Sequence, residues 1–166
     1  GPGLGDSLSA TVVVEFLTGF RGPIVVDADG LNLLAGVPHF NIPDARRVVL
    51  TPHPGEARRL LAARGIDRAI DASSPARRAA ASALSAAFGC TVVLKGRQTI
   101  VTNGDRIYTN ETGNAGMATG GTGDVLTGVI AALIGQKMDP LEASILGVFL
   151  HGLAGDYAAE ELGRWS

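Results

Sequence analysis

The chain has 166 residues, 46% of them hydrophobic and 18% charged, with a formal net charge of -2. This composition is typical of one globular domain with an apolar core, so we treat residues 1–166 as a single domain. It offers no basic tract for a nucleic acid or an anionic membrane, and we expect neither as a partner.

Cys90 is the only cysteine, which excludes an internal disulfide and a cysteine-rich zinc site. We interpret it as a buried small residue in a protein of a reducing, cytoplasmic compartment. The apolar runs are shorter than the about 20 residues that a membrane helix needs, and no secretion signal is recognisable. Three arginine pairs are expected on solvated surfaces: Arg46-Arg47, Arg58-Arg59 and Arg77-Arg78.

The hydrophobic pattern predicts helices and strands that alternate along the chain. A first helix is expected to be capped by Asp6 or Ser7 and to extend to about Phe20. Short apolar segments, typical of buried parallel strands, stand at 24–26, 48–50 and 91–95. Further helices are expected at 31–35, 56–64, 74–88, 125–134 and 140–162. The expected fold is α/β, with a mostly parallel central sheet flanked by helices on both faces and an antiparallel hairpin near Asn103-Gly104.

Residues 114–124 read Asn-Ala-Gly-Met-Ala-Thr-Gly-Gly-Thr-Gly-Asp and stand directly before an apolar run of helical character. Closely spaced glycines let backbone N–H groups converge, and a helix N-terminus behind them adds the positive end of its dipole. The segment therefore predicts an anion cradle for a phosphate. The alternative is a flexible turn at 120–123 with Asp124 as a simple helix cap.

Polar residues also follow the expected strands. Open α/β sheets bind ligands at the carboxyl ends of their strands, and this chain places Asp27, Asp29, His53 and Lys95 there, with Asp124 after the cradle. The alternatives are an exposed turn for His53 and a solvated charge for Lys95. The convergence of these residues favours one shared ligand site. The P-loop, the dinucleotide fingerprint, zinc-ligand spacing and the nucleophile elbow are absent.

Five motifs follow one another over most of the chain: 1–5, 26–34, 50–56, 93–96 with Thr99, and 113–124. Together they resemble the ADP-dependent NAD(P)H-hydrate dehydratases, which have a ribokinase-like fold. The resemblance implies repair of hydrated NADH or NADPH. The β-phosphate of ADP passes to the 6-hydroxyl of the damaged ring, and its elimination returns NAD(P)H with AMP and phosphate.

The resemblance also implies roles for the matched positions. Asp124 is the base that accepts the hydroxyl proton. The contacts to the hydrated dinucleotide are Gly3, Gly5, Asn32, His53 and Asp124. The contacts to ADP or AMP are Lys95, Gly96, Arg97, Gln98, Thr99 and Gly123. The phosphate cradle is Asn114, Gly120, Gly121, Thr122 and Gly123. Mg²⁺ is expected with ADP, or with ATP as an alternative donor, and Glu56 is the one suggested metal ligand.

Family members carry a further N-terminal stretch with the first strands of the sheet. We therefore expect 1–166 to be a partial domain, completed by a longer natural chain or by another chain such as an epimerase partner. A homo-oligomer is expected, with the apolar final helix as its surface. Two other functions stay open: another ribokinase-like small-molecule kinase, and a non-catalytic, truncated nucleotide-binding module. Family members usually have Ala where Gly30 stands.

Overall fold

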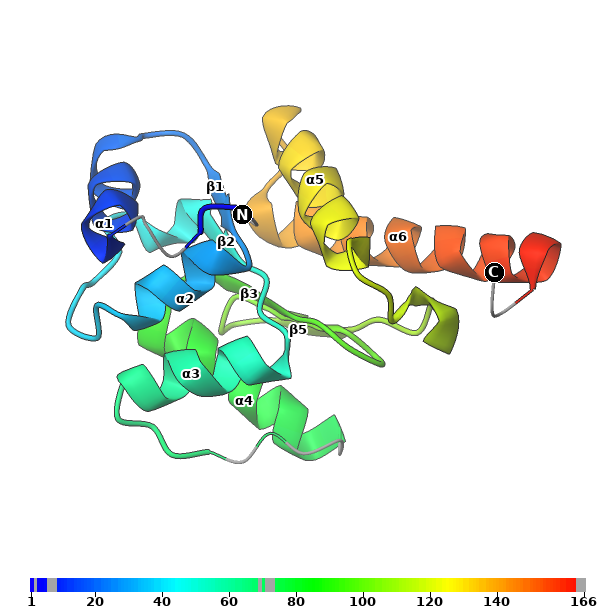
Figure 1. Cartoon of the computed structure of the whole chain (residues 1–166), viewed down its shortest axis with the longest axis horizontal. Helices are drawn as coiled ribbons and strands as arrows, with labels where there is room; N and C mark the ends of the chain where they lie inside the picture. Colours follow the sequence, from blue (N-terminus) through cyan, green and yellow to red (C-terminus); the bar gives the residue numbers. More distant parts are fainter. Residues whose placement is uncertain (2, 6–8, 69, 71–73, 164–166) are drawn as a thin grey trace.

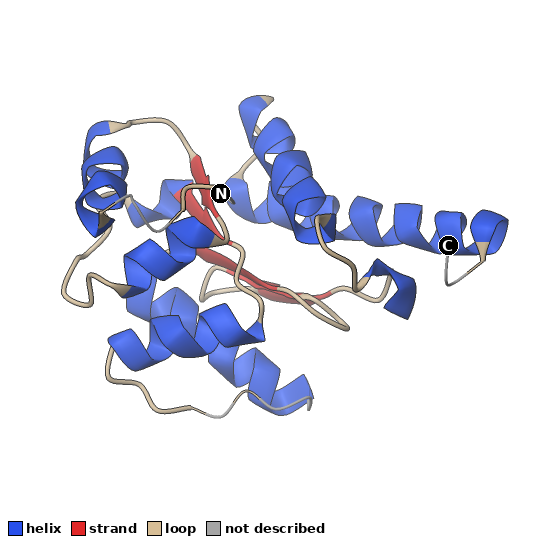
Figure 2. Ribbon diagram, in the orientation of Figure 1, coloured by secondary structure: helices blue, strands red, loops and turns tan. Residues whose placement is uncertain are grey.

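The computed structural model describes residues 1, 3–5, 9–68, 70 and 74–163. Strands in this part of the chain form one sheet in the order in which they occur: β1 (Ile24–Val26), β2 (Val48–Leu50), β3 (Thr91–Leu94), β4 (Ile100–Thr102) and β5 (Ile107–Thr109). β1, β2 and β3 are parallel, whereas β4 pairs antiparallel with both β3 and β5. The predicted strands and hairpin are confirmed, and the sheet is mixed, with a parallel half and a meander half (Figure 2).

The helices of the described ranges are α1 (Ala10–Gly19), α2 (Asp29–Ala35), α3 (Pro54–Ala63), α4 (Ser74–Phe88), α5 (Thr122–Gly135) and α6 (Pro140–Leu162). Two short 3₁₀ turns join them, η1 (Ala45–Arg47) and η2 (Ala115–Met117). The predicted bounds of α4 and α6 are confirmed, and Asp139 caps α6 through its side chain. The predicted caps of α1, Asp6 and Ser7, lie outside the described residues, and Ser9 is the N-cap position.

The molecule has three layers, with the sheet between two groups of helices (Figure 1). Alternate residues of a strand point to opposite faces of a sheet. In β2, Val48 and Leu50 therefore join one buried cluster and Val49 joins the other. α1 to α4 complete the first cluster, and α5 and α6 complete the second. Helices cover both faces of the sheet, as the sequence predicts.

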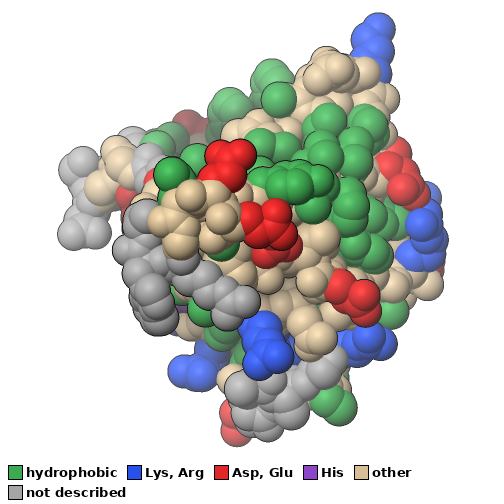
Figure 3. All heavy atoms as spheres, turned by 90° about the vertical axis from the view of Figure 1, so that its right-hand side faces the viewer, with side chains coloured by type: hydrophobic (Ala, Val, Ile, Leu, Met, Phe, Trp, Pro, Cys, Tyr) green, Lys and Arg blue, Asp and Glu red, His purple; other side chains and the backbone are tan. Residues whose placement is uncertain are grey.

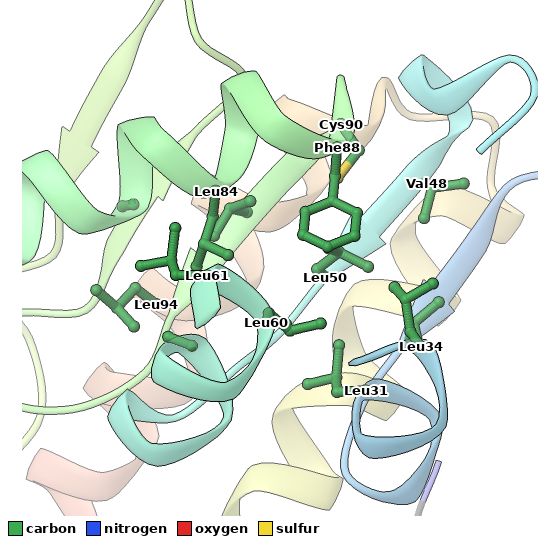
Figure 4. Close-up of a cluster of buried hydrophobic side chains, with 14 of the residues drawn as sticks. Leu31, Leu34, Val48, Leu50, Leu60, Leu61, Leu84, Phe88, Cys90 and Leu94 are labelled. Atoms are coloured by element: carbon green, nitrogen blue, oxygen red, sulfur yellow. The ribbon is translucent and has the colours of Figure 1, made fainter. Parts of the chain in front are cut away.

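The first cluster fixes the loops that follow β2 and β3. Leu60 of α3 and Leu84 and Phe88 of α4 pack around Leu50 of β2 (Figure 4), and each is at most 5% exposed. Full burial of such a side chain stabilises a fold by roughly 1.5–3 kcal/mol. Because α3 and α4 are held firmly to the strands, the strand ends stand on a rigid base.

Cys90 lies between α4 and β3 and is 1% exposed, which confirms its prediction as a buried small residue. Burial raises the pKa of its thiol to about 12. Since the thiolate is the reactive form, we expect iodoacetamide at pH 8 to leave the native protein unlabelled while it labels the urea-unfolded protein fully. Mass spectrometry counts the label, and equally fast labelling of both forms would contradict this burial.

Arg47 departs from the expectation that the arginine pairs are solvated. Its side chain is 10% exposed, and its guanidinium donates to the carbonyl oxygens of Leu17 at 2.5 Å and Gly22 at 2.8 Å. Leu17 lies in the last turn of α1 and Gly22 follows its end, where carbonyl groups lack partners within the helix. The prediction is wrong for Arg47 because it joins α1 to β2, whereas Arg46 and the pair 58–59 are exposed as predicted.

No helix in the described ranges is long and apolar enough to cross a membrane. α6 nevertheless keeps large apolar side chains at the surface, with Phe149 39% and Tyr157 60% exposed. Figure 3, seen from the right-hand side of Figure 1, shows hydrophobic side chains gathered beside acidic ones. Apolar gatherings of this kind commonly mark contact surfaces.

Candidate functional site

The glycine-rich segment forms the start of α5. Gly121 occupies the N-cap position with φ 86°, a left-handed conformation that glycine adopts without strain. The helix therefore begins at Thr122, three residues before its predicted start, and the hydroxyl oxygens of Thr119 and Thr122 lie 2.9 Å apart. A side-chain carbon built on Gly120 or Gly121 would meet nothing within 4 Å. The helix N-terminus is thus open to an anion from solvent.

Asn114 joins this segment to α6. Its amide nitrogen donates to the carbonyl oxygen of Gly155 at 2.8 Å and to Oδ1 of Asp156 at 3.0 Å. Its amide oxygen accepts from the backbone N–H of Gly116 at 3.0 Å, which caps η2. The backbone N–H of Gly113 donates to the other oxygen of Asp156 at 2.8 Å. These contacts make Asn114 a support of the cradle, and a direct contact to phosphate stays a prediction.

An open cleft of about 500 Å³ lies between the cradle and α6. Its lining combines the cradle with apolar side chains: Met117, Gly120, Gly121, Thr122, Val125, His151, Ala154 and Gly155. Burial lowers the pKa of His151, and a hydrogen bond with the backbone of Thr122 opposes this only in part. Burial thus favours the neutral form of the His151 imidazole. An apolar cleft beside an anion cradle suits a ligand with an aromatic ring next to a phosphate.

Asp27 stands directly after β1 and is 1% exposed. Its Oδ1 accepts from Nζ of Lys95 at 2.7 Å, and its Oδ2 accepts from Oγ1 of Thr127 at 2.7 Å. Burial raises the pKa of Asp27, but the hydrogen bonds from Lys95 and Thr127 outweigh burial and bring it below its usual range. The predicted meeting of strand ends is confirmed here, because β1, the end of β3 and α5 converge on one carboxylate.

Lys95 also lies close to the cradle. A side-chain carbon built on Gly123 would stand 3.3 Å from Nζ of Lys95, so the ammonium lies against the first turn of α5. Its own backbone N–H donates to the carbonyl oxygen of Pro52 at 2.8 Å, which fixes the end of β3 to the end of β2. Lys95 is therefore no solvated charge, and its side chain is 18% exposed.

The rest of the predicted nucleotide segment is a tight turn after β3. Gly96 has φ 135° and Gln98 has φ 55°, and the hydroxyl of Thr99 donates to the carbonyl oxygen of Gly96 at 2.9 Å. The side chains of Arg97 and Gln98 are exposed. This turn thus presents backbone and polar groups to solvent next to Lys95.

Arg77 of α4 holds that turn through hydrogen bonds, although it was expected on a solvated surface. It is 7% exposed and donates to the carbonyl oxygens of Lys95, at 3.2 Å, and of Arg97. The prediction is wrong because the turn brings carbonyl groups over α4. The sequence did hold a signal, since Arg77 continues the buried helical stripe of Ala80, Ala81 and Leu84.

His53 and Glu56 form the cap of α3. The Nδ1 atom of His53 accepts from the backbone N–H groups of Gly55 at 2.9 Å and Glu56 at 3.4 Å, and Oε2 of Glu56 accepts from the backbone N–H of His53 at 2.8 Å. This reciprocal pair is a capping box, and it begins the helix two residues before the predicted start. The His53 side chain remains 50% exposed and accessible to a ligand. Its substrate contact stays a prediction.

The N-terminal loop reaches the end of β1 through Asp29. The backbone N–H of Gly5 donates to Oδ2 of Asp29 at 3.2 Å. Gly3 is exposed with φ 81° and open space around it. Asn32 is exposed on α2, and its amide oxygen accepts from Nε of Arg59 at 3.0 Å. Gly5 therefore lies beside the strand ends, whereas the substrate contacts of Gly3 and Asn32 remain predictions.

Within the described residues, no group of three or more His, Cys, Asp or Glu side chains could hold a metal ion. Glu56 is buried and engaged in the cap of α3. Mg²⁺ commonly binds through one or two carboxylates together with the phosphates of a nucleotide. The part of the chain that the structure describes therefore offers no metal site of its own, and Mg²⁺ would be held mainly by the nucleotide phosphates.

The mixed sheet between two helical layers, with an anion cradle at the start of α5, defines a ribokinase-like α/β protein. A ribokinase-like superfamily protein from Enterococcus faecalis V583 superposes with a TM-score of 0.78 and 30% identity, over 96% of this chain and 54% of that one. The family model described as NAD(P)H-hydrate dehydratase (Carb_kinase) matches residues 1–166, and the chain belongs to this family.

Named relatives agree with this assignment. The bifunctional NAD(P)H-hydrate repair enzyme Nnr of Moorella thermoacetica is 43% identical over 166 residues, which are 99% of this chain and 30% of that protein. The ADP-dependent (S)-NAD(P)H-hydrate dehydratase of Neisseria meningitidis serogroup B is 44% identical over 85% of this chain and 47% of its own length. The chain thus spans less than half the length of these two relatives.

A solved relative was crystallised with a nucleotide. The ADP/ATP-dependent NAD(P)H-hydrate dehydratase from Bacillus subtilis, co-crystallised with ATP and Mg²⁺, superposes with a TM-score of 0.70 and 31% identity, over 87% of this chain and 49% of that one. A hydroxyethylthiazole kinase from Pyrococcus horikoshii OT3 has a TM-score of 0.74 at 21% identity over 94% of this chain and 61% of that one, and shares the fold.

Proposed function

We propose that this chain carries the site of an ADP-dependent NAD(P)H-hydrate dehydratase, which restores hydrated NADH or NADPH to the reduced cofactor. One observation supports this most directly: the open N-terminus of α5 has Asp124 in its first turn and the Lys95 ammonium against Gly123. A phosphoryl transfer needs such an arrangement, because positioning and charge stabilisation supply most of its catalysis.

In the proposed reaction the 6-hydroxyl oxygen attacks the β-phosphorus of ADP, and the bond from that phosphorus to the oxygen shared with AMP breaks. Asp124 accepts the hydroxyl proton. The C6–O bond then breaks and releases phosphate, while C5 loses a proton and the ring double bond returns. The backbone N–H groups of Gly123 and its neighbours stabilise the charge on the transferring phosphoryl group.

The substrates divide between two parts of the site. The turn at 95–99 and the cleft beside the cradle receive ADP, and ATP is the alternative donor. The N-terminal loop with Gly5 and the exposed ring of His53 receive the hydrated dinucleotide. Mg²⁺ would be held mainly by the nucleotide phosphates and would neutralise charge that otherwise resists attack. We further propose a cytoplasmic location, where the reduced nicotinamide pool is used.

The surface of the molecule supports further partners. Among the described strands β1 pairs with β2 alone, and an uncovered edge strand is prone to pair with another chain. We propose that further strands, from a longer chain or from another chain, cover that edge. The exposed apolar side chains of α6 support a homo-oligomer. A monomer in light scattering would contradict the proposed homo-oligomer.

A substrate screen tests the proposed function against the two other readings. The protein is incubated with Mg²⁺, ADP or ATP, and either hydrated NADH or hydroxyethylthiazole. A dehydratase releases phosphate only with the hydrated cofactor. A small-molecule kinase forms a phosphorylated alcohol and releases no phosphate. Nucleotide binding without any product would identify a non-catalytic module, and either of these two results would overturn the proposal.

A further inference from the structure

Asp27 is a buried carboxylate outside the groups that the proposed reaction uses. A charge taken out of water is costly unless it is paired and hydrogen-bonded. Here both carboxylate oxygens are engaged, one with the ammonium of Lys95 and one with the hydroxyl of Thr127, each at 2.7 Å. With a side chain that is 1% exposed, Asp27 cannot itself reach a substrate in the cleft. Its effect on a ligand has to pass through its partners.

Those partners come from distant parts of the sequence. Lys95 follows Asp27 by 68 residues and Thr127 follows it by 100. Lys95 stands at the end of β3, and Thr127 lies on α5 shortly after the cradle. Asp27 therefore fixes the position of the cradle helix relative to the strand end that bears the lysine.

The ammonium of Lys95 lies where an anion in the cradle would meet it. Nζ would stand 3.3 Å from a side-chain carbon on Gly123, so a larger residue there would push the ammonium away from the cradle by a few tenths of an ångström. An ammonium group has three N–H donors, and within the described part of the chain Asp27 is its one hydrogen-bond acceptor. Two donors therefore remain for an anion in the cradle.

We propose that Asp27 is a positioning residue for nucleotide binding, which holds the Lys95 ammonium against the phosphate-binding end of α5. Thr127 in turn orients the carboxylate. This role rests on the proposed function, because it needs a nucleotide phosphate in the cradle. A lysine stem is flexible, and a free one would lose more conformational entropy on binding than one that is already held.

A double-mutant cycle tests this role. ADP with Mg²⁺ is titrated by calorimetry into wild type, Asp27→Asn, Lys95→Met and the double variant. Asp27→Asn is expected to raise the Kd for ADP roughly tenfold, since a misplaced binding group commonly costs that much or more. In the Lys95→Met background Asp27→Asn should change the Kd less than about twofold, because the group it positions is gone. A merely structural carboxylate would weaken binding equally in both backgrounds.

Thr127→Val keeps the shape of the side chain and removes one hydrogen bond, so it covers the case that Asp27→Asn fails to fold. It is expected to raise the Kd about threefold, while Thr11→Val, on the exposed side of α1, leaves the Kd unchanged. Wild-type affinity in Thr127→Val and Asp27→Asn, or losses that multiply in the double variant, would overturn the role of Asp27. No ADP binding by wild type would instead overturn the proposed function together with this role.

Discussion

Asp124→Asn is expected to lower turnover by roughly 10²–10⁴-fold, the usual contribution of a positioned general base. Asparagine has nearly the same shape but cannot accept the proton of the attacking hydroxyl. Asp124 is exposed in the first turn of α5, so the exchange leaves the packing intact. It removes only a favourable charge at the helix N-terminus, worth about 0.3–1 kcal/mol. The Kd for ADP should therefore stay within a few-fold of wild type.

Steady-state kinetics with saturating ADP and hydrated NADH measure this effect, and calorimetry measures the affinity. Asp105→Asn is a matched control, because it makes the same chemical change on the exposed turn between β4 and β5. The control should retain full turnover. Turnover in Asp124→Asn within tenfold of wild type would reject Asp124 as the base, and the proton would then have to go elsewhere.

Gly152→Ala is expected to destabilise the fold by about 2–3 kcal/mol, as overpacking of a close contact does. α6 passes so near the loop before the cradle that an added carbon on Gly152 would stand 2.2 Å from Oγ1 and 2.8 Å from the backbone of Thr112. That loop is also fastened to α6 by Asn110, whose amide donates to the carbonyl oxygen of Val148 at 3.2 Å. The loop must shift, and the cradle behind it should bind ADP more weakly.

Urea unfolding of Gly152→Ala and of Gly128→Ala compares two glycines within helices. Gly128 lies on α5 with nothing within 4 Å of an added carbon, so Gly128→Ala should stabilise the fold by about 0.5–1 kcal/mol through helix propensity. Opposite signs for the two changes would support the close approach of α6 to the loop. Equal stability of Gly152→Ala and wild type would contradict it.

Local signals explain which elements the sequence could predict. The three parallel strands have short, mainly apolar segments, and α6 has Asp139 and Pro140 at its start, so the hydrophobic pattern and the cap indicate the same element. The hairpin followed from Asn103-Gly104 alone. The hydrophobic pattern predicts the start of α5 three residues too late, because the first residues of the helix, Thr122, Gly123 and Asp124, are not apolar.

The sequence predicted which residues lie at the candidate site, but not all of the hydrogen bonds that hold them. The carboxyl ends of parallel strands lie at one edge of a sheet, so the sequence alone predicted that Asp27 and Lys95 lie close together. The hydroxyl of Thr127 lies 100 residues from Asp27, and no local pattern marks such a partner. Arg77 does continue the buried stripe of α4, but the carbonyl groups that accept its hydrogen bonds come from the turn after β3. Only the tertiary structure reveals the partners of Thr127 and Arg77.

The most direct test is the recovery of reduced nicotinamide by the protein as it stands. Hydrated NADH, Mg²⁺ and ADP are mixed with the protein, and the absorbance of the reduced-nicotinamide band is followed while AMP and phosphate are quantified. The account predicts that NADH, AMP and phosphate appear in equal amounts, and that Asp124→Asn forms almost none of them. ADP that binds while the band stays flat in wild type would contradict dehydratase activity in residues 1–166.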